Sequence, residues 1–251
     1  MKNQSTDTRE LRSFGRRHGR KLSPRQEALL ADLLPRVRVD LTSPLSTLSA
    51  SPDLTPGDND PAKTPNPTNL ALQLWFEIGF GGAEHLIWQA EHNPGVTIIG
   101  CEPFEEGVVK ALTGIDAKHL RNVRLHPDDA RDVLRWLPIA SLDRCFILFP
   151  DPWPKKRHAK RRLITPATLS LLARAMKPGA ELRIGTDIGD YARTVLLSMQ
   201  TAPQFEWQAS RATDWRCRPD DWPETRYEAK AVREGRCRYY LRFRRTQVQL
   251  G

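Results

Sequence analysis

Short apolar runs alternate with amphipathic helical patterns from Leu70 onward, and this alternation constrains the fold more than any other feature of the chain. Runs of apolar and β-branched residues predict strands, whereas apolar residues spaced three or four apart predict helices. The predicted strands span residues 70–78, 96–101, 123–125, 142–149, 181–185 and 205–209. The predicted helices span residues 83–92, 104–112, 131–137 and 191–200, with a further helix capped at Thr165 and stopped by Pro178-Gly179. Repeated β–α–β units of this kind form a mostly parallel, doubly wound sheet.

The last strand has a different pattern. Cys237, Tyr239, Leu241 and Phe243 alternate with basic or aromatic residues, and a period of two predicts a strand with one wet, basic face. No clear helix separates this strand from 205–209, so the two are expected to close the sheet as an antiparallel pair. The predicted fold class is therefore α/β: a doubly wound, Rossmann-like sheet with a C-terminal antiparallel strand pair.

Composition divides the chain into three parts. Residues 1–40 are basic, and 41–69 are rich in Ser, Thr, Pro and Asp, which is typical of a flexible linker. Residues 70–251 hold the predicted α/β domain. The formal net charge of +9 favours a polyanionic partner. No apolar run approaches the roughly 20 residues of a membrane span. The N-terminus is polar from its first residue, so no signal peptide is expected.

The chain has four cysteines, and none of them form a CxxC pair. No histidine cluster supplies the remaining ligands of a zinc site, so no metal is expected. Cys101 and Cys145 fall in predicted strands and are expected to pack as small core residues. This cysteine usage indicates a reducing cytoplasm.

The loop after the fourth strand carries an unusual combination. Asp151 stands between two prolines, Trp153 follows, and six lysines and arginines occur within residues 155–162. An open α/β sheet binds its ligands at the carboxyl ends of its strands. One loop thus brings together a conformationally restricted acid, a stacking ring and phosphate-seeking cations, which suits an enzyme that acts on a nucleic-acid base.

The first strand ends in a glycine-rich turn, Glu77-Ile78-Gly79-Phe80-Gly81-Gly82. A dinucleotide fingerprint beginning at Gly79 would need a small residue where Glu84 stands, and a carboxylate there opposes a pyrophosphate. S-adenosylmethionine, which has no phosphate, fits better. Acids follow the next two strands at Glu102 and at 128–129. They can hold the ribose hydroxyls and the adenine edge, or they can be ordinary helix-start acids.

Taken together, these pieces resemble the bacterial tRNA (guanine-N7)-methyltransferase family. The matching segments are 12–14, 77–81, 100–104, 149–153, 160–162, 185–187 and 225–228. The resemblance implies a class I S-adenosylmethionine-dependent methyltransferase acting on a guanosine in the variable region of tRNA, at position 46. It implies cofactor contacts at Glu77, Gly79, Gly81, Glu102, Asp129, Ala130 and Asp151. It implies substrate contacts at Lys155, Asp187, Thr225, Arg226, Tyr227 and Glu228.

The chain departs from the family pattern at two positions. Ala83 replaces a usual glycine and is expected to crowd the turn, and Pro154 stands where relatives are often polar. The preference for Asp129 over Asp128 rests on the Ala130 that follows it. Relatives act as monomers or as homodimers, and both states stay open for this chain.

Guanine N7 carries an in-plane lone pair and needs no deprotonation, so no general base is expected. Asp151 is the predicted catalytic residue, because a carboxylate stabilises the positive charge that develops on the ring. Several alternatives stay open: Trp153 can anchor its own loop, Asp187 can cap a helix, and Thr225 with Glu228 can form a capping box. The competing functions are a methyltransferase for another RNA or a small molecule, and a non-catalytic RNA-binding module.

Overall fold

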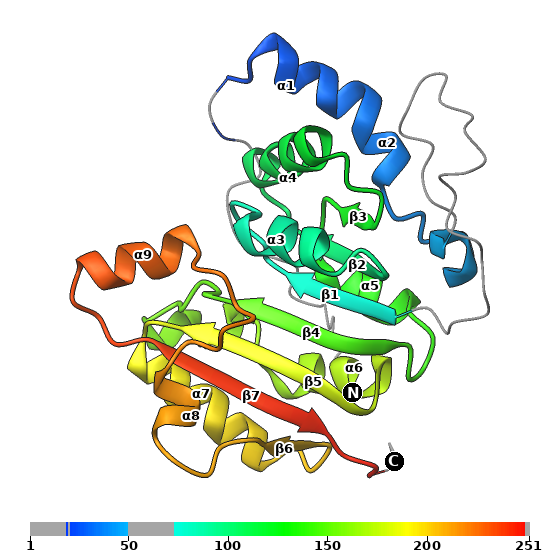
Figure 1. The fold of residues 1–251 in the computed structure, drawn as a ribbon. Coiled ribbons are helices and arrows are strands. Elements are labelled where there is room, and N and C mark those ends of the chain that lie inside the picture. The colour runs from blue at the N-terminus through cyan, green and yellow to red at the C-terminus, as the bar shows by residue number, and fades with distance from the viewer. Residues whose placement is uncertain (1–18, 20, 50–72, 249–251) are drawn as a thin grey trace, which may run out of the picture.

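A computed structural model describes residues 19, 21–49 and 73–248 of the chain. Their centre is a seven-stranded sheet (Figure 1). The strands are β1 (Gln73–Ile78), β2 (Val96–Cys101), β3 (Val123–His126), β4 (Leu142–Leu148), β5 (Met176–Thr186), β6 (Phe205–Trp207) and β7 (Tyr239–Arg245). The spatial order is β3-β2-β1-β4-β5-β7-β6. The first five strands are parallel, and β7 runs antiparallel to both β5 and β6. The predicted fold class is confirmed.

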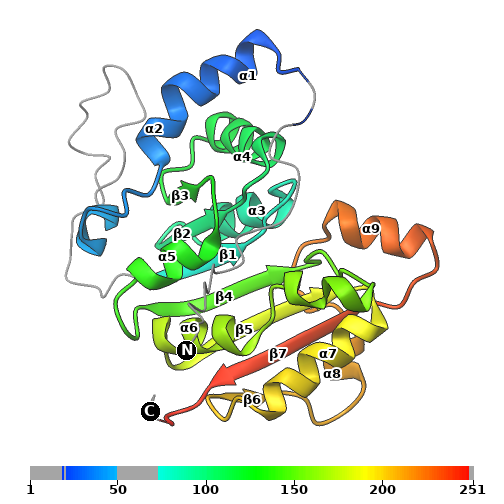
Figure 2. The same ribbon diagram turned by 180° about the vertical axis from the view of Figure 1, so that it is seen from behind.

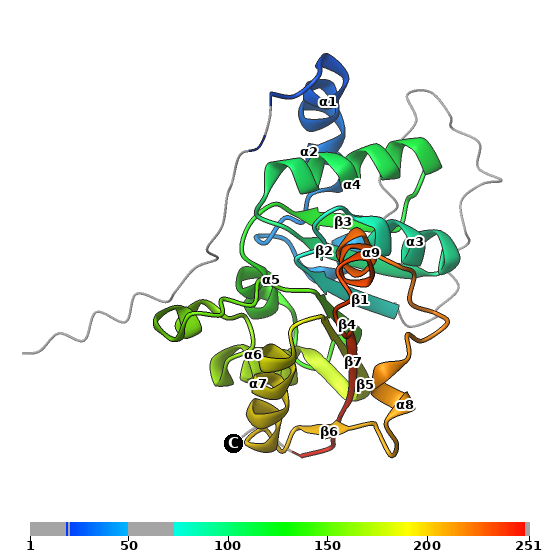
Figure 3. The same cartoon turned by 90° about the vertical axis from the view of Figure 1, so that its left-hand side faces the viewer.

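Two layers of helices cover the sheet. On one face lie α3 (Glu84–His92) and α4 (Glu105–Lys118). The other face is covered by α5 (Ala130–Trp136), α6 (Pro166–Ala175) and α7 (Gly189–Gln200), which come to the front when the molecule is turned (Figure 2). Figure 3 looks along the strands and separates the two layers. Each face of the sheet has its own apolar core. Phe146 belongs to the core under α3 and α4, and Phe76 to the core under α5, α6 and α7.

Most elements form where the sequence predicts them, because apolar spacing and capping agree. The helix expected to stop at Pro178-Gly179 ends earlier, at Ala175, because the backbone is already extended at Met176, and Pro178-Gly179 lie within β5. Thr165 caps α6 by accepting a hydrogen bond from the Thr168 N–H, and Pro166 occupies its first turn. The helix predicted at 104–112 continues to Lys118, since Ile115 extends the apolar stripe and is buried. Cys101 and Cys145 are buried in the core as predicted.

Part of the expected linker packs against the domain. The chain before β1 forms α1 (Pro24–Ala28), the π-helix η1 (Leu29–Leu33), α2 (Leu34–Val37) and the 3₁₀ helix η2 (Leu45–Ser49). Leu48 is buried, its carbonyl accepts a hydrogen bond from Arg124, and Trp136 donates to the Ser43 carbonyl. Residues 41–49 therefore differ from a flexible linker, because they pack against an apolar surface of the domain. Residues 50–69 lie outside the described part, and the division into three segments stays a prediction.

Two further short helices were not predicted, and they correct the expectation that no clear helix separates the last two strands. They are α8 (Thr213–Arg216) and α9 (Arg226–Arg233), between β6 and β7. In Figures 1 and 3, α9 lies beside α3, in front of the edge where β1 and β4 end. The chain between β6 and β7 thus returns to the carboxyl edge of the sheet. Within the described residues, no helix combines the length and the apolar character needed to cross a bilayer.

Candidate active site

The candidate site lies where the chain reverses its direction of winding. The strands β1 and β4 are neighbours, β2 and β3 extend the sheet to one side, and β5 extends it to the other. Ligands of open α/β sheets bind at such a switch point, outside the carboxyl ends of the strands. Glu77 lies near the end of β1, Glu102 directly follows β2, and Asp151 follows β4. The topology therefore delivers all three predicted acids to one edge.

The turn between β1 and α3 depends on left-handed backbone conformations. Gly79, Gly81 and Ala83 have φ angles of 72°, 53° and 64°. A glycine adopts this region without cost, whereas a residue with a Cβ loses about 1–2 kcal/mol. The left-handed conformation at Ala83 is one that glycine adopts more readily than alanine. A Cβ added at Gly79 would meet nothing within 4 Å, so open space lies beside the turn.

Glu77 is buried and points to the face that α3 covers. Its Oε2 lies 2.8 Å from Nδ1 of His85, and the side chains of both residues are almost completely buried, at 2% and 1% exposure. A buried carboxylate needs such a partner, since desolvation without hydrogen bonds is costly. His85 is the second residue of α3, so the helix that follows the glycine turn also holds the acid that precedes it.

Glu102 connects the ends of β1 and β2. Its Oε2 accepts a hydrogen bond from the Gly81 N–H at 2.9 Å, and its Oε1 accepts one from the Phe104 N–H at 3.0 Å. Burial raises the pKa of Glu102 above its ordinary value, against the effect of the two hydrogen bonds, and the charges of Asp151 and Glu77 raise it further. The three predicted acids are thus close enough to interact electrostatically.

Asp129 is buried and serves as the N-cap of α5. Its Oδ1 accepts a hydrogen bond from the Arg131 N–H at 2.9 Å, and the Arg131 guanidinium binds both of its oxygens. Ala130, the first residue of α5, is also buried. Asp128 is half-buried and accepts a hydrogen bond from the Asp129 N–H at 2.9 Å. Both acids serve the start of the helix, which is the alternative that the sequence left open.

The loop that carries Asp151 is shaped by two residues with positive φ, Phe149 at 49° and Trp153 at 40°. Arg162 fastens this loop to α7: it donates to the Pro152 carbonyl at 3.0 Å, to Thr194 and to Asp190. Asp151 itself is exposed, yet partial desolvation of its carboxyl raises the pKa above the ordinary value. The loop therefore presents a restrained acid to solvent.

Trp153 anchors this loop. The Arg161 guanidinium lies 5.0 Å from the centre of its ring, and the ring of His158 meets it edge-on at 5.8 Å. The guanidinium covers one face of the indole, and these contacts favour the anchoring alternative for Trp153. Lys155 and Arg157, in contrast, are exposed. The basic run thus has two parts, because Arg161 and Arg162 hold the loop while Lys155 and Arg157 face the solvent.

The segment 225–228 begins α9. The Thr225 hydroxyl caps the helix by accepting a hydrogen bond from the Glu228 N–H at 3.2 Å. Glu228 is buried, accepts a hydrogen bond from the Tyr240 hydroxyl and pairs with Arg218 at 3.1 Å. Only half of the expected capping box forms, since the Glu228 carboxylate turns toward β7 rather than back to Thr225. Burial raises the pKa of Glu228 above its ordinary value.

The next two residues lie on the glycine turn. Arg226 pairs with Glu84, the first residue of α3. A Cβ added at Gly81 would lie 2.8 Å from Cε2 of Tyr227, which places the phenol ring directly on the turn. Burial raises the pKa of Tyr227, and the charge of Glu102 adds to this effect. The predicted substrate segment and the predicted cofactor turn are therefore in contact.

Asp187 follows β5, at the same edge of the sheet. It pairs with Arg236 at 3.0 Å, just before β7 begins. The Ile188 N–H donates to the Thr186 hydroxyl at 3.2 Å, and no side chain caps α7, so the capping alternative does not describe Asp187. Asp187 thus links the end of β5 to the chain that enters β7.

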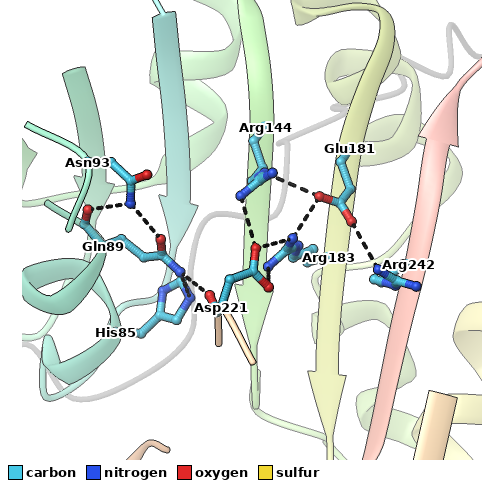
Figure 4. A network of polar contacts seen from close by, with 8 residues as sticks. All are labelled: His85, Gln89, Asn93, Arg144, Glu181, Arg183, Asp221 and Arg242. Atoms are coloured by element: carbon cyan, nitrogen blue, oxygen red, sulfur yellow. Dashed lines mark hydrogen bonds and ion pairs between the residues drawn. The ribbon is translucent and has the colours of Figure 1, made fainter. Parts of the chain in front are cut away.

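A polar network behind the site was not predicted. It runs from His85 and Gln89 on α3 to Asp221, and from there to Arg144, Arg183, Glu181 and Arg242 on the sheet (Figure 4). The four-residue spacing of His85 and Gln89 was the only signal in the sequence, because it puts both on one helix face. On a surface helix such a pair normally faces water. Here, however, the chain between α8 and α9 covers it.

Comparison with known proteins identifies a family for this chain. Residues 72–241 match the sequence profile of the family described as "Putative methyltransferase". A Hyphomonas neptunium protein named tRNA (guanine-N(7)-)-methyltransferase is 48% identical over 223 residues, 88% of this chain and 94% of that protein. A Rhodospirillum rubrum protein of the same name is 48% identical over 238 residues, 95% of this chain and 89% of that protein. The solved structure of the 16S rRNA methyltransferase KamB covers 69% of this chain and 88% of its own, with a TM-score of 0.51 and 16% identity, and shares the fold alone.

Proposed function

This chain belongs to the tRNA (guanine-N(7)-)-methyltransferase family, and we propose that it transfers a methyl group from S-adenosylmethionine to N7 of a guanosine in the variable region of tRNA. The observation that carries the proposal is the shared edge of the sheet: Glu102 follows β2 and holds the Gly81 N–H of the glycine turn, and Asp151 follows the neighbouring strand β4. Directly after Asp151, the same loop exposes Lys155 and Arg157. This arrangement supports the proposal, because an acid for the cofactor, a catalytic acid and cations for phosphates would all act at this edge.

The residues around the turn fit S-adenosylmethionine. When bound, this cofactor supplies an electrophilic methyl group on a sulfonium. Glu77 would hold the ammonium of its amino-acid end, and Glu102 would hold the ribose hydroxyls. Asp129 and the Ala130 N–H would contact the adenine edge. The open space beside Gly79 supports this fit, because a ligand can approach the backbone there without meeting a side chain.

The chain itself has little chemistry to perform. The lone pair of guanine N7 is already available, so no residue has to remove a proton before attack. Positive charge then develops on the imidazole ring of the base, and the Asp151 carboxylate stabilises that charge. The prolines on both sides of Asp151 and the clamp from Arg162 hold the carboxylate in place, so little reorganisation is needed during transfer.

The remaining residues at this edge would bind the RNA. Lys155 would contact a backbone phosphate, and Asp187 with the segment 225–228 would enclose the nucleotide. A target guanosine in a folded tRNA has to leave its tertiary contacts or be flipped locally, because side chains reach the deep groove of an RNA duplex poorly. A tRNA substrate also places the protein in the cytoplasm.

The test is methyl transfer to bulk unmodified tRNA from labelled S-adenosylmethionine, followed by mapping of the product. N7-methylguanosine is labile to alkali, so strand scission reports the modified position. We expect one scission site in the variable region, and a tRNA in which that guanosine is replaced by adenosine should accept no label. Labelling of another nucleotide, or of no RNA, would overturn the proposed function.

A further inference from the structure

We propose that His85 is a positioning residue that sets the Glu77 carboxylate for the amino-acid end of S-adenosylmethionine, and that Gln89 couples it to the chain segment that leads into α9. This inference rests on the proposed function, because it assigns a ligand group to Glu77. It adds two residues to the site and a physical link between the cofactor side and the RNA side. Three sets of contacts support it: the contact between Glu77 and His85, the hydrogen bonds of Gln89, and the ion pairs of Asp221.

The Glu77–His85 pair is rigid. The 2.8 Å contact between His85 Nδ1 and Glu77 Oε2 takes one oxygen of the carboxylate and leaves the second for a ligand. The imidazole meets the ring of Phe146 edge-on at 4.6 Å and that of Trp222 at 6.3 Å. Neighbouring rings on two sides prevent the imidazole from swinging away, so the carboxylate keeps one orientation.

Gln89 determines which nitrogen of His85 carries the proton. Its Nε2 lies 2.8 Å from the Asp221 carbonyl oxygen, which can only accept, so the atom in that position must be the donor nitrogen. The same Nε2 lies 3.1 Å from His85 Nε2, which must then accept. The His85 proton therefore sits on Nδ1 and is donated to Glu77. Asn93 completes the arrangement by donating to Gln89 Oε1 at 3.2 Å.

Asp221 anchors the bridge to the sheet. Arg183 donates to both of its carboxylate oxygens, at 2.9 and 2.8 Å, and Arg144 lies 3.6 Å away (Figure 4). Although burial raises the pKa of Asp221, the hydrogen bonds and charge of Arg183 lower it overall. The next residue, Trp222, is completely buried against His85 and Tyr240.

One anchored segment thus serves two purposes. Its backbone carbonyl orients Gln89 and, through it, His85 and Glu77. A few residues later the same segment becomes α9, whose Arg226 and Tyr227 lie on the glycine turn. A displacement of this segment would therefore reach the cofactor acid and the RNA-facing helix together.

The test compares two ligands that differ at the amino-acid end. S-adenosylhomocysteine carries that end, and 5′-methylthioadenosine lacks it. In His85→Phe, the ring volume stays and the donor is lost, so we expect S-adenosylhomocysteine binding to weaken at least about tenfold, as for a lost hydrogen bond to a charged group. Binding of 5′-methylthioadenosine should change less than about twofold. Titration calorimetry on the full chain measures both.

Two amide variants provide a matched pair. The Asn side-chain nitrogen occupies the place of His Nδ1, whereas the Gln nitrogen corresponds to Nε2. We expect His85→Asn to bind S-adenosylhomocysteine several times more tightly than His85→Gln, although the two are chemically alike. This comparison keeps the test valid if His85→Phe fails to fold. Equal affinities of the two amide variants would overturn the positioning role, and so would equal losses for the two ligands.

Gln89→Leu tests the coupling. It keeps the side-chain size and removes the bond to the Asp221 carbonyl, so we expect both weaker S-adenosylhomocysteine binding and a several-fold higher KM for tRNA. His85→Phe should leave the KM for tRNA unchanged at saturating S-adenosylmethionine. An unchanged KM in Gln89→Leu would overturn the coupling. If the unmodified protein binds no S-adenosylhomocysteine, the proposed function itself fails, which is a separate result.

Discussion

The two parts of the candidate site differ in how completely the protein satisfies its own charged groups. On the cofactor side, Glu77, Glu102 and Asp129 are all buried, and each accepts hydrogen bonds from donors of the chain. On the loop after β4, Asp151 and Lys155 are exposed. The proposed cofactor side is set by contacts within the domain, whereas the loop of Asp151 presents charges to the solvent. The other proposed RNA contacts resemble the cofactor side, because Asp187, Arg226 and Glu228 are paired within the chain.

This difference corresponds to the ligands that each side would meet. A small cofactor makes few contacts, so its affinity depends on groups that are already oriented. A tRNA brings many phosphates, and cations that face water can neutralise them without prior order. The basic loop combines both principles, because Arg161 and Arg162 fix its shape while Lys155 and Arg157 remain outside.

The largest effect is expected for Asp151→Ala. Loss of the carboxylate removes the group that we propose stabilises the developing charge, and we expect the rate of methyl transfer to fall by about 100-fold or more. Thermal unfolding should stay close to that of the unmodified protein, since Asp151 is exposed. Single-turnover kinetics at saturating tRNA measure the rate. A rate near that of the unmodified protein would show that Asp151 is not a catalytic acid.

The pH dependence of the methyl-transfer rate tests the role of the exposed Asp151 in a second way. Partial desolvation raises the pKa of Asp151, so its proton returns at a higher pH than for an ordinary aspartate. Below that pKa the rate should fall about tenfold per pH unit. Because the pKa of Asp151 is higher in the folded protein than in the unfolded chain, the folded state binds this proton more readily. Protonation of Asp151 at low pH therefore adds to the free energy of unfolding and does not cause the protein to unfold.

The measurement is a pH–rate profile under single-turnover conditions, with circular dichroism at each pH. We expect the acidic limb to disappear from the residual activity of Asp151→Asn, which cannot titrate. A limb that persists in this variant would assign the titration to another group, such as Glu102, whose pKa is also raised by burial.

Gly107→Ala probes how tightly the cofactor side is packed. An alanine normally stabilises a helix by about 1 kcal/mol relative to glycine. A Cβ at Gly107, however, would lie 2.5 Å from the Gly81 carbonyl and 2.8 Å from Glu102 Cγ. We expect the free energy of unfolding to fall by about 1–3 kcal/mol, with weaker cofactor binding, because the turn has to move.

Gly95→Ala is the matched control, since a Cβ there meets nothing within 4 Å. Its effect on stability should stay within about 0.5 kcal/mol. Urea unfolding measures both variants. If Gly107→Ala were as stable as Gly95→Ala, the cofactor side would be far less rigid than its contacts indicate.

The smallest effect is expected for Lys155→Gln, on the exposed loop after β4. Removal of one phosphate contact should reduce the slope of log affinity against log salt concentration by about 0.7–0.9, with cofactor affinity unchanged. Arg121→Gln removes one exposed charge near the opposite edge of the sheet, before β3, and should leave the slope unaltered. Filter binding across a salt series decides between them. Equal slopes for the two variants would contradict the assignment of Lys155 to the RNA.

Local patterns in the sequence were sufficient for the fold and for the position of the acids. Apolar spacing placed every strand of the sheet, and the Thr165-Pro166 pair placed the start of α6, because both depend on neighbours in the chain. The acids could be located in advance because parallel strands always end at one edge. The packing of residues 41–49 could not be predicted in this way, since it depends on contacts with distant segments of the chain.

The sequence by itself determined the doubly wound sheet, the glycine turn and the loop of Asp151, since each follows from residues that are adjacent or regularly spaced. Only the tertiary structure decided which polar groups meet. His85 and Glu77 are joined by the turn between them, Gln89 reaches Asp221 across 132 positions, and Tyr227 comes to rest on Gly81. Such contacts carry no local signal, because a side chain's partner depends on how the whole chain packs.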